Sequence, residues 1–399
     1  MAVFRISAKA ETSCKAGHPW IYSNEITEID GEYENGDIVT VRSGKDKFIG
    51  FGFVNDNSKI RIRLVSRNAN DKFDDEFWRR RVRYAVDYRR AVMGEDDFRC
   101  CRLIFGEADT FPGLTVDRFE NVLVTEVLCL GIEQRKDVIY KALLDTLSDC
   151  GEQIDVIYER SDSPIRALEG MQTHSGFYHG SGDGHVKITE NKVIYDVDYI
   201  NGQKTGFFLD QKYNRAAIRK IANGRKVLDC FTHTGAFACN AAAAGASFVT
   251  AVDVSKTALD AAEKNAALNG LSDKIEFVCA DVFDYLTELS VNKKSDYDFI
   301  ILDPPAFTKS RDTIKDAMRG YKEINLKAMR LLPRGGYLAT CSCSHFMRDS
   351  IFCQMIHAAS EDAGVSLRQV EARQQSPDHP ILWNVPETDY LKFYIFQTV

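Results

Sequence analysis

The chain has 399 residues, of which 44% are hydrophobic and 27% charged, and its formal net charge is −7 at pH 7. That length favours two or three domains, and the composition excludes an intrinsically disordered chain. No apolar stretch approaches the ~20 residues of a membrane span, and Met1–Ala10 lacks the apolar core of a secretory signal. We therefore expect a soluble, cytoplasmic protein with no membrane partner.

The eleven cysteines predict neither disulfides nor a metal centre. Their number is odd, no C-x-x-C pair occurs, and the eight histidines show neither H-x₃-H nor H-E-x-x-H spacing. Free thiols of this kind are typical of a reducing compartment. We expect no bound metal.

The first part of the chain, residues 1–69, predicts a small β-barrel. Short apolar segments such as the alternating run Ile60–Ser66 are separated by turn sequences, for example Asp30-Gly31 and Asn35-Gly36-Asp37. In the alternating run, Arg61 and Arg63 should share one face of the strand.

Residues 70–195 predict a central α+β domain. An arginine-rich helix is followed by a hairpin over Leu114–Val127, a helix near Gln134–Leu147 and a glycine-rich loop over residues 176–184. The domain divides the predicted barrel from a third region, residues 196–399.

The helix of the central domain carries six arginines and one aspartate between Arg79 and Arg90, a local net charge of +5. Apolar residues recur there at helical spacing, which predicts an amphipathic helix with a guanidinium-rich face. Because the guanidinium fork suits phosphate, we expect Arg79, Arg80 and Arg83 to bind a nucleic-acid substrate. The alternative is a solvated face paired with acidic neighbours such as Asp74, Asp75 and Glu76, and the sequence does not separate the two.

Residues 196–399 alternate strand and helix, and four consecutive predicted strands each end in an aspartate. Three further strands, near Tyr337–Ser342, Ser366–Arg373 and Tyr390–Gln397, would complete a sheet of about seven. In an open parallel sheet, ligands bind beyond the carboxyl ends of the strands. The four aspartates that should meet there are Asp229, Asp253, Asp281 and Asp303.

The turn after the first of these strands indicates which ligand binds. It reads V-L-D-C-F-T-H-T-G-A and contains only Gly235, whereas a pyrophosphate cradle has the pattern G-x-G-x-x-G. A cofactor with a ribose and no phosphate fits better, with Asp253 on the ribose, Asp229 near an amine and Asp281 near an adenine amino group. These demands describe S-adenosylmethionine. The alternative is that the aspartates only cap helices.

The fourth strand runs into Asp303-Pro304-Pro305-Ala306-Phe307. Two prolines hold the following backbone extended, so this loop can fix a carbonyl and an aromatic ring beside a planar ligand. We expect Pro304, Pro305 and Phe307 to contact a substrate base and Asp303 to hydrogen-bond it.

The next strand, Y-L-A-T-C-S-C-S-H, carries two cysteines two residues apart, which point to one side if the strand persists. Cys343, nearer the open end, should be more exposed than Cys341. A thiolate there could add to C6 of a pyrimidine and make C5 able to take a methyl group. The alternative is a buried strand cysteine.

Several long motifs in the same order resemble one family along nearly the whole chain. Beside the strand-end motifs, they are His18–Ile26, Gly106–Phe119, Asn201–Arg215 and Asp378–Lys392. The chain resembles the bacterial ribosomal RNA large subunit methyltransferase I family, PUA-domain proteins that methylate cytosine C5 in 23S ribosomal RNA with S-adenosylmethionine.

The resemblance implies a C-terminal Rossmann-like class I methyltransferase domain with a seven-stranded sheet, preceded by an N-terminal PUA-like β-barrel and a central α+β domain. It implies that Cys343 is the nucleophile, that Asp303 holds the cytosine and that 23S ribosomal RNA is the partner, with a homodimer as one possible assembly. The implied cofactor residues are Phe208, Gln211, Arg215, Asp229, Phe231, Thr234, Gly235, Asp253, Val254, Asp281 and Val282.

Two other functions stay open on the sequence. The loop D-P-P-A-F resembles the Asn/Asp-Pro-Pro-aromatic loop of amino-group methyltransferases, so the acceptor could be a base nitrogen and Cys343 structural. A ribosome-assembly factor without activity is the other, and the complete set of four aspartates disfavours it.

Overall fold

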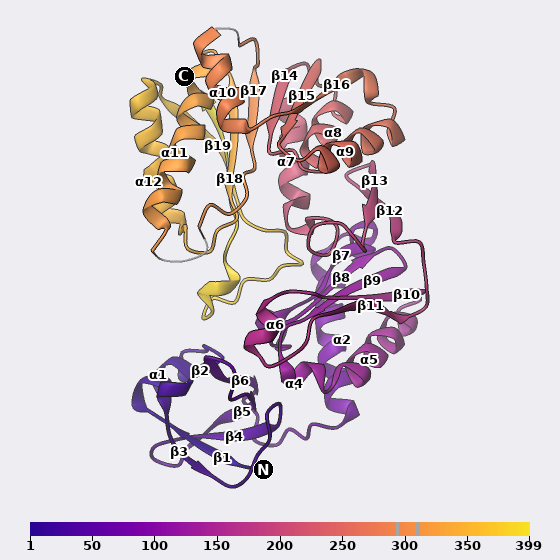
Figure 1. The fold of residues 1–399 in the computed structure, drawn as a ribbon, viewed down its shortest axis with the longest axis vertical. Helices are drawn as coiled ribbons and strands as arrows, with labels where there is room; N and C mark the ends of the chain where they lie inside the picture. The colour runs from indigo at the N-terminus through magenta and orange to yellow at the C-terminus, as the bar shows by residue number, and fades with distance from the viewer. Residues whose placement is uncertain (293–294, 309–311) are drawn as a thin grey trace. The chain divides into compact units, whose positions relative to one another are not determined.

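The computed structural model describes residues 1–292, 295–308 and 312–399, and the chain forms two compact units (Figure 1). Each unit is built from several chain segments. The first comprises Met1–Ile188, Val197–Leu209 and Pro377–Thr388, and the second Thr189–Asp196, Asp210–Ser376 and Asp389–Val399. No helix of the described residues is long and apolar enough to cross a membrane.

The first unit begins with a six-stranded sheet in the order β2-β6-β5-β4-β1-β3. Buried positions alternate along β4, as expected for strands with one face toward a core. Its strands are β1 (Val3–Ile6), β2 (Trp20–Tyr22), β3 (Ile26–Asp30), β4 (Ile38–Ser43), β5 (Phe48–Val54) and β6 (Ile60–Ser66). The helix α1 (Ala8–Lys15), capped by Ser7, lies between β1 and β2 and was not predicted.

A five-stranded sheet in the order β11-β10-β9-β8-β7 follows in the same unit. The arginine-rich helix α2 (Asp75–Val92) packs on it with buried Phe77, Trp78 and Val82, and the predicted hairpin is β8 paired antiparallel with β9. The strands are β7 (Cys100–Phe105), β8 (Leu114–Phe119), β9 (Val122–Val127), β10 (Val156–Ser161) and β11 (His174–His179). The other helices are α3 (Glu95–Phe98), α4 (Leu130–Glu133), α5 (Lys136–Asp149) and α6 (Ile165–Leu168).

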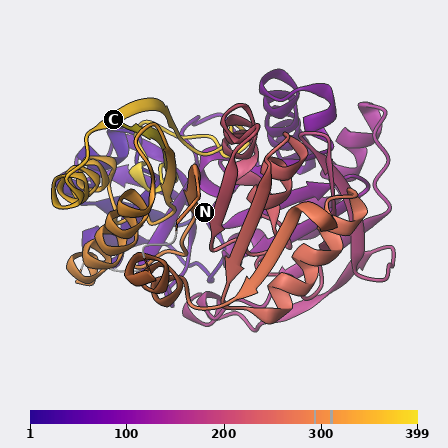
Figure 2. The same cartoon turned by 90° about the horizontal axis from the view of Figure 1, so that it is seen from above.

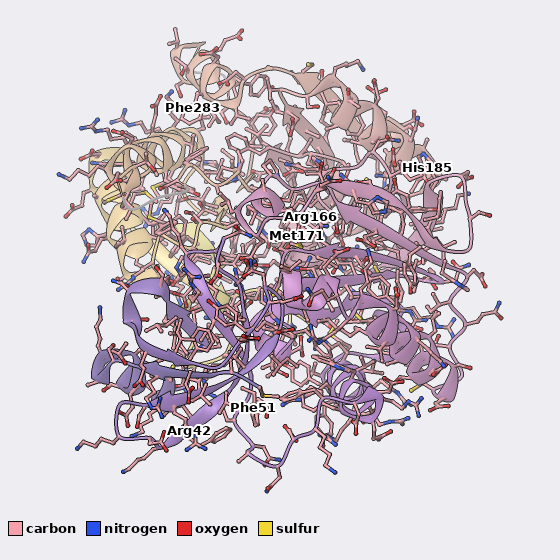
Figure 3. All side chains as sticks on the ribbon, turned by 60° about the horizontal axis from the view of Figure 1, so that its bottom comes forward. Arg42, Phe51, Arg166, Met171, His185 and Phe283 are labelled. Carbon is pink, nitrogen blue, oxygen red and sulfur yellow. The ribbon has the colours of Figure 1, made fainter. Side chains whose placement is uncertain are left out.

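A buried arginine fixes the short helix α6 in this unit. Arg166 donates from Nη1 to the Val127 carbonyl at 2.5 Å and to Glu133 at 3.0 Å. Its own carbonyl accepts the Met171 N–H at 2.9 Å, and the two residues lie side by side in Figure 3. The loop that precedes β11 is therefore anchored to β9.

The second unit contains a seven-stranded sheet in the order β16-β15-β14-β17-β18-β20-β19. The five strands from β16 to β18 run parallel, whereas β20 is antiparallel to both β18 and β19. Figure 2 shows the strands fanned by the usual sheet twist. The strands are β14 (Lys226–Cys230), β15 (Phe248–Asp253), β16 (Ile275–Cys279), β17 (Phe299–Leu302), β18 (Tyr337–Ser342), β19 (Leu367–Arg373) and β20 (Lys392–Thr398).

Helices cover this sheet in two groups, as in a doubly wound α/β fold. In one group α7 packs against α8 and α8 against α9, and in the other α11 packs against α10 and α12 (Figure 1). Apolar side chains of the second group form one core with β14, β17 and β18. The helices are α7 (Lys212–Ala222), α8 (Ala236–Ala243), α9 (Lys256–Leu268), α10 (Val282–Asn292), α11 (Ile314–Leu331) and α12 (Asp349–Ala363).

The strands β12 (His185–Glu190) and β13 (Val193–Asp198) pair with each other, and the division between the units falls within both. Two predictions of local structure differ from what is observed. The glycine-rich loop predicted over residues 176–184 begins within strand β11, because His174–His179 pairs with β10. The third predicted strand end, Asp281, lies two residues beyond β16. The strand predicted near Tyr337–Ser342 is confirmed as β18, so Cys343 lies one residue beyond it.

Candidate active site

Asp229 lies one residue before the end of β14, the first of the strands that carry the site, and its side chain is completely buried. Thr232 Oγ1 donates to Asp229 Oδ2 at 2.5 Å. The other oxygen, Oδ1, is buried and has no hydrogen-bond partner among the described residues, although the Ala238 N–H is near enough to lower the pKa of the carboxyl. A buried acceptor without a donor is costly, so this atom is suited to receive one from a ligand.

The turn between Asp229 and α8 adopts an unusual backbone conformation. Phe231, His233 and Gly235 all have positive φ, of 63°, 51° and 78°. Two of them are not glycine, and such strain persists where the surroundings fix it, often at ligand sites. A Cβ on Gly235 would lie 2.9 Å from that of Ala262, which explains glycine at this position. Thr234 is held as well, because its carbonyl accepts from Asn265 Nδ2 at 3.0 Å.

Asp253 ends β15 and accepts two backbone N–H groups. His233 donates to Oδ2 and Ser255 to Oδ1, both at 2.9 Å, so this carboxylate joins the strained turn to the next loop. Val254, beside it, is 70% exposed and offers an open apolar surface at the strand end.

Asp281 caps α10 through bonds from Phe283 N at 2.8 Å and Asp284 N at 3.3 Å to Oδ1. This is the capping role that the sequence left as an alternative. Its neighbour Val282 is buried in the helical core.

The carboxylates of the strand ends affect one another's protonation. Burial, with Asp303 and Asp253 nearby, raises the pKa of Asp229 to about 7 although Thr232 donates to it. Burial and the charge of Asp210 raise the pKa of Asp303 to about 6. The end of the sheet is thus a negative, poorly solvated site that favours a cationic ligand.

Asp303 follows β17 and is oriented by residues at the start of α7. Gln211 Nε2 donates to Asp303 Oδ1 at 3.0 Å, and Asn214 Nδ2 donates to Gln211 Oε1 at 2.6 Å. Asn214 thereby fixes the amide so that its NH₂ group points to the carboxyl. Asp210 lies close by, with Oδ2 accepting from Tyr390 OH at 2.7 Å.

The loop after Asp303 is firmly packed. Pro304 is buried and Pro305 exposed, and the ring of Phe307 lies 4.6 Å from that of Tyr321 and 5.8 Å from that of Phe283. Figure 3 labels Phe283 on α10. The aromatic contacts hold the loop in one position.

Cys343 comes directly after β18 and is half-buried, whereas Cys341 within the strand is fully buried. The expected order of exposure of the two thiols is confirmed. Cys343 Sγ lies 3.9 Å from the Pro304 carbonyl oxygen, which brings the thiol to the loop that begins at Asp303. Burial, next to Asp303, raises the pKa of Cys341 well above its usual value, so this thiol stays protonated.

Arg215 lies close enough to Asp303 for its charge to lower the pKa of that carboxyl. Arg215 is buried in an ion pair with Glu190, with distances of 2.5 and 2.7 Å. Phe208 belongs to the first unit, where Lys204 Nζ lies 5.4 Å from its ring. Their contact with the cofactor stays a prediction.

The arginines of α2 are paired with acids. Arg80 contacts Asp71 at 3.3 Å and Arg83 contacts Asp149 at 2.8 Å, while Arg79 lies 3.7 Å from Asp145. Only Arg79 also reaches one of the acids named from the sequence, Glu76 at 3.9 Å. All three side chains remain 40–47% exposed, so the helix keeps a basic surface.

Three residues of the site were missed from the sequence. Thr232 and Asn214 are spaced three residues from Asp229 and Gln211, a separation that allows local side-chain bonds but does not demand them. The third, Lys392, is a single cation within the apolar run Y-L-K-F-Y-I-F and is 4% exposed. An isolated lysine in such a run is the signal that could have identified it. Within the described residues no cluster of three or more His, Cys, Asp or Glu side chains could hold a metal ion.

Comparison with known proteins identifies the class of protein that has this doubly wound sheet with acidic residues at its strand ends. The chain is an S-adenosylmethionine-dependent methyltransferase: the model of that family matches residues 172–396, and the model of the PUA-like domain matches residues 4–67. Within the class it belongs to the ribosomal RNA large subunit methyltransferase I family. It is 39% identical to the Pseudoalteromonas translucida protein of that name over 97% of both chains.

Solved structures share the fold along the full length. A Streptococcus mutans protein described as a SAM-dependent methyltransferase superimposes with a TM-score of 0.83 at 23% identity, covering 100% of both chains. A second structure with the same scores and coverage is described as a methyltransferase complexed with SAH.

The cofactor of the chain is S-adenosylmethionine, and the observed residues fit it. The molecule carries a sulfonium and an ammonium group, and the carboxyls of Asp229, which is buried, and Asp303, which is half-buried, favour positive charge nearby. The Asp229 oxygen that lacks a donor can accept from the ammonium group. The turn at Gly235 brings the start of α8 to the strand end without a phosphate cradle.

Proposed function

We propose that this chain methylates C5 of a cytosine in the RNA of the large ribosomal subunit, through a covalent bond between Cys343 and C6 of the base. The relatives that are 39% identical are named for large-subunit ribosomal RNA, and this supports the substrate. The observation that carries the chemistry is the 3.9 Å separation of Cys343 Sγ and the Pro304 carbonyl oxygen. This distance places the half-buried thiol of Cys343 beside the loop that begins at Asp303, and the carboxyl of Asp303 has a raised pKa.

In this mechanism Cys343 acts as the thiolate. Its sulfur donates an electron pair to C6, and the electrons of the C5–C6 double bond move toward N3. Asp303, whose raised pKa of about 6 keeps a minor fraction protonated near neutral pH, donates that proton to N3 and accepts from the N4 amino group. The bound cofactor supplies an electrophilic methyl group for C5. C5 then loses its proton to water, the C6–S bond breaks with its electron pair returning to sulfur, and N3 returns its proton to Asp303.

The cofactor residues are proposed on the same basis. The end of β14 is surrounded by Asp229, Thr234, Gly235 and Asp253. Asp281 caps α10, and Val282 is the first residue of that helix. Phe231 and Val254 would supply apolar contact, with Gln211 adjoining the carboxyl of Asp303. Arg215 and Phe208 complete the proposed set.

RNA binding is assigned to the PUA-like barrel and to α2. The side chains of Arg79, Arg80 and Arg83 are 40–47% exposed, and ion pairs at the surface contribute only ~0–1 kcal/mol, so phosphates can compete with their carboxylate partners. Phosphate contacts of this kind position RNA without reading its sequence. The target base must leave its stack to reach the thiol.

The test is nucleoside analysis of RNA after reaction. Large-subunit RNA that lacks the modification is incubated with enzyme and labelled cofactor, digested, and separated by mass. We expect labelled 5-methylcytidine with the wild type and C341A, and none with C343A. Labelled N-methylated purine, formed equally by C343A, would show instead that the chain is a nitrogen methyltransferase.

A further inference from the structure

Lys392 is a buried cation in a strand of the catalytic unit. It begins β20, is 4% exposed, and is followed by the apolar run Phe393–Phe396. Lysine is rarely buried to this degree unless its ammonium group has partners. Here Nζ donates to the carbonyls of Ser344 at 2.7 Å and Tyr390 at 2.8 Å.

Both chain neighbours of Cys343 are tied to this lysine. Ser342 is the register partner of Lys392 where β18 pairs with β20, and Ser344 supplies the carbonyl that accepts from Nζ. The segment Ser342–Ser344 is thus held to Lys392 on both sides of the thiol-bearing residue. The ammonium group at the end of the lysine side chain is held close to Cys343 because it donates to the backbone carbonyl of the next residue, Ser344.

Asp389 is the strongest of the negative groups near Nζ, and the Cys343 thiol is the next. Burial lowers the pKa of Lys392 to about 8, while Asp389, Cys343 and Asp349 favour its charged form. Asp349 already accepts from Tyr394 OH at 2.6 Å. Among the described residues Nζ forms no ion pair with a carboxylate, and its two observed acceptors are neutral carbonyls.

We propose that Lys392 is a positioning residue that stabilises the Cys343 thiolate, its ammonium group providing the positive charge and its carbonyl contacts the location. When the thiol ionises, the S–H bond breaks, the proton passes to water, and the sulfur keeps the electron pair. At neutral pH, below its pKa of about 8, Lys392 keeps its own proton during this step. A thiol in ordinary surroundings is mostly protonated at neutral pH, so a nearby cation raises the fraction able to attack. This proposal rests on the proposed role of Cys343 as nucleophile.

The experiment measures the thiol directly, without RNA or cofactor. Full-length protein is treated with iodoacetamide between pH 5.5 and 9.5, and alkylation of the Cys343 peptide is followed by mass spectrometry. We expect K392Q to slow alkylation of Cys343 at pH 7 at least ten-fold and to move the midpoint of its pH profile upward. K392R should restore most of the wild-type profile, and K327Q, which removes another carbonyl-bonded lysine of this unit, should leave it unchanged.

The fully buried Cys341 reports on folding in the same digest. If K392Q exposes Cys341 to the reagent, K392M replaces it as the uncharged variant of similar length. A wild-type pH profile in the folded uncharged variant would overturn the proposal, as would a failure of K392R to restore it. Because the assay involves no methyl transfer, loss of the nucleophile hypothesis would appear separately, as methylation that survives in C343A.

Discussion

Gln211 Nε2 donates to Asp303 Oδ1 at 3.0 Å, and this bond joins the start of α7 to the end of β17. Asn214 fixes the orientation of the amide from its other end. Burial and Asp210 raise the pKa of Asp303 to about 6, and the Gln211 bond opposes that rise. The proton affinity of the proposed acid therefore depends in part on a residue that belongs to a different element of the fold.

Replacing Gln211 by leucine should raise the pKa of Asp303 further, because a donor to its ionised form is lost. In the proposed mechanism protonated Asp303 is the active form, so the fall of kcat/KM on the alkaline side should begin at higher pH in Q211L. The measurement is kcat/KM from pH 5 to 9. If the alkaline limb of the kcat/KM profile does not move in Q211L, Asp303 is not the group that transfers the proton.

Asp229→Asn should raise stability and weaken cofactor binding. The folded pKa of Asp229, about 7, lies above the unfolded value near ~3.9, so the folded state binds the extra proton. Its unfavourable contribution is absent below about pH 4, grows as pH rises, and is complete above pH 7. Three pKa units set an upper bound of ~4 kcal/mol on the gain in D229N at pH 8.

Urea unfolding at pH 5 and pH 8 checks the first part, and calorimetric titration with S-adenosylmethionine checks the second. We expect the difference in unfolding free energy between D229N and wild type to be larger at pH 8. Cofactor affinity should fall at least ten-fold, because the ammonium group loses its anionic acceptor. Equal differences at both pH values would contradict burial of an ionised Asp229.

The buried pair of Arg215 and Glu190 should be structural. Removing one partner leaves an unpaired buried charge, so R215M should lower the free energy of unfolding by ~3–5 kcal/mol. Replacing both partners by apolar residues, as in E190L with R215M, should recover part of that loss. Denaturant unfolding gives both values, and cofactor affinity of the folded double variant then decides whether Arg215 also contacts the cofactor, as the family resemblance implies.

Arginines of α2 should affect RNA binding and not stability. In R80A with R83A, RNA affinity should fall and the slope of log affinity against log salt should become shallower by ~1.4, about 0.7 for each lost phosphate contact. Stability should change by less than ~1 kcal/mol per pair. The matched control is R319A on α11, a more exposed arginine also paired to an aspartate. An equal loss of RNA affinity in R319A would show that α2 is not a specific part of the RNA-binding surface.

Much of the catalytic unit was predictable from the sequence because hydrophobic period and strand-end residues are local signals. The seven strands, the turn at Gly235 and the aspartates at the carboxyl edge follow from them, and the fold class is confirmed. Boundaries were less accurate: the strand before Asp281 ends early, because that aspartate caps α10 rather than extending the ladder.

What the sequence could not show are contacts that join distant segments. The bond from Gln211 to Asp303 spans 92 residues, and the pairing of Ser342 with Lys392 depends on the antiparallel position of β20. The acids that pair with Arg80 and Arg83 likewise come from outside α2, and not from Asp74, Asp75 and Glu76 at its start.

The most direct test of the central role of Cys343 uses RNA that contains 5-fluorocytidine. Fluorine at C5 cannot leave as a proton does, so a methylated base should remain bonded through C6 to the thiol. We predict a protein–RNA adduct on a denaturing gel that requires S-adenosylmethionine, forms with C341A and is absent with C343A. Methyl transfer to the RNA without any adduct, or an adduct that persists in C343A, would contradict covalent catalysis by this cysteine.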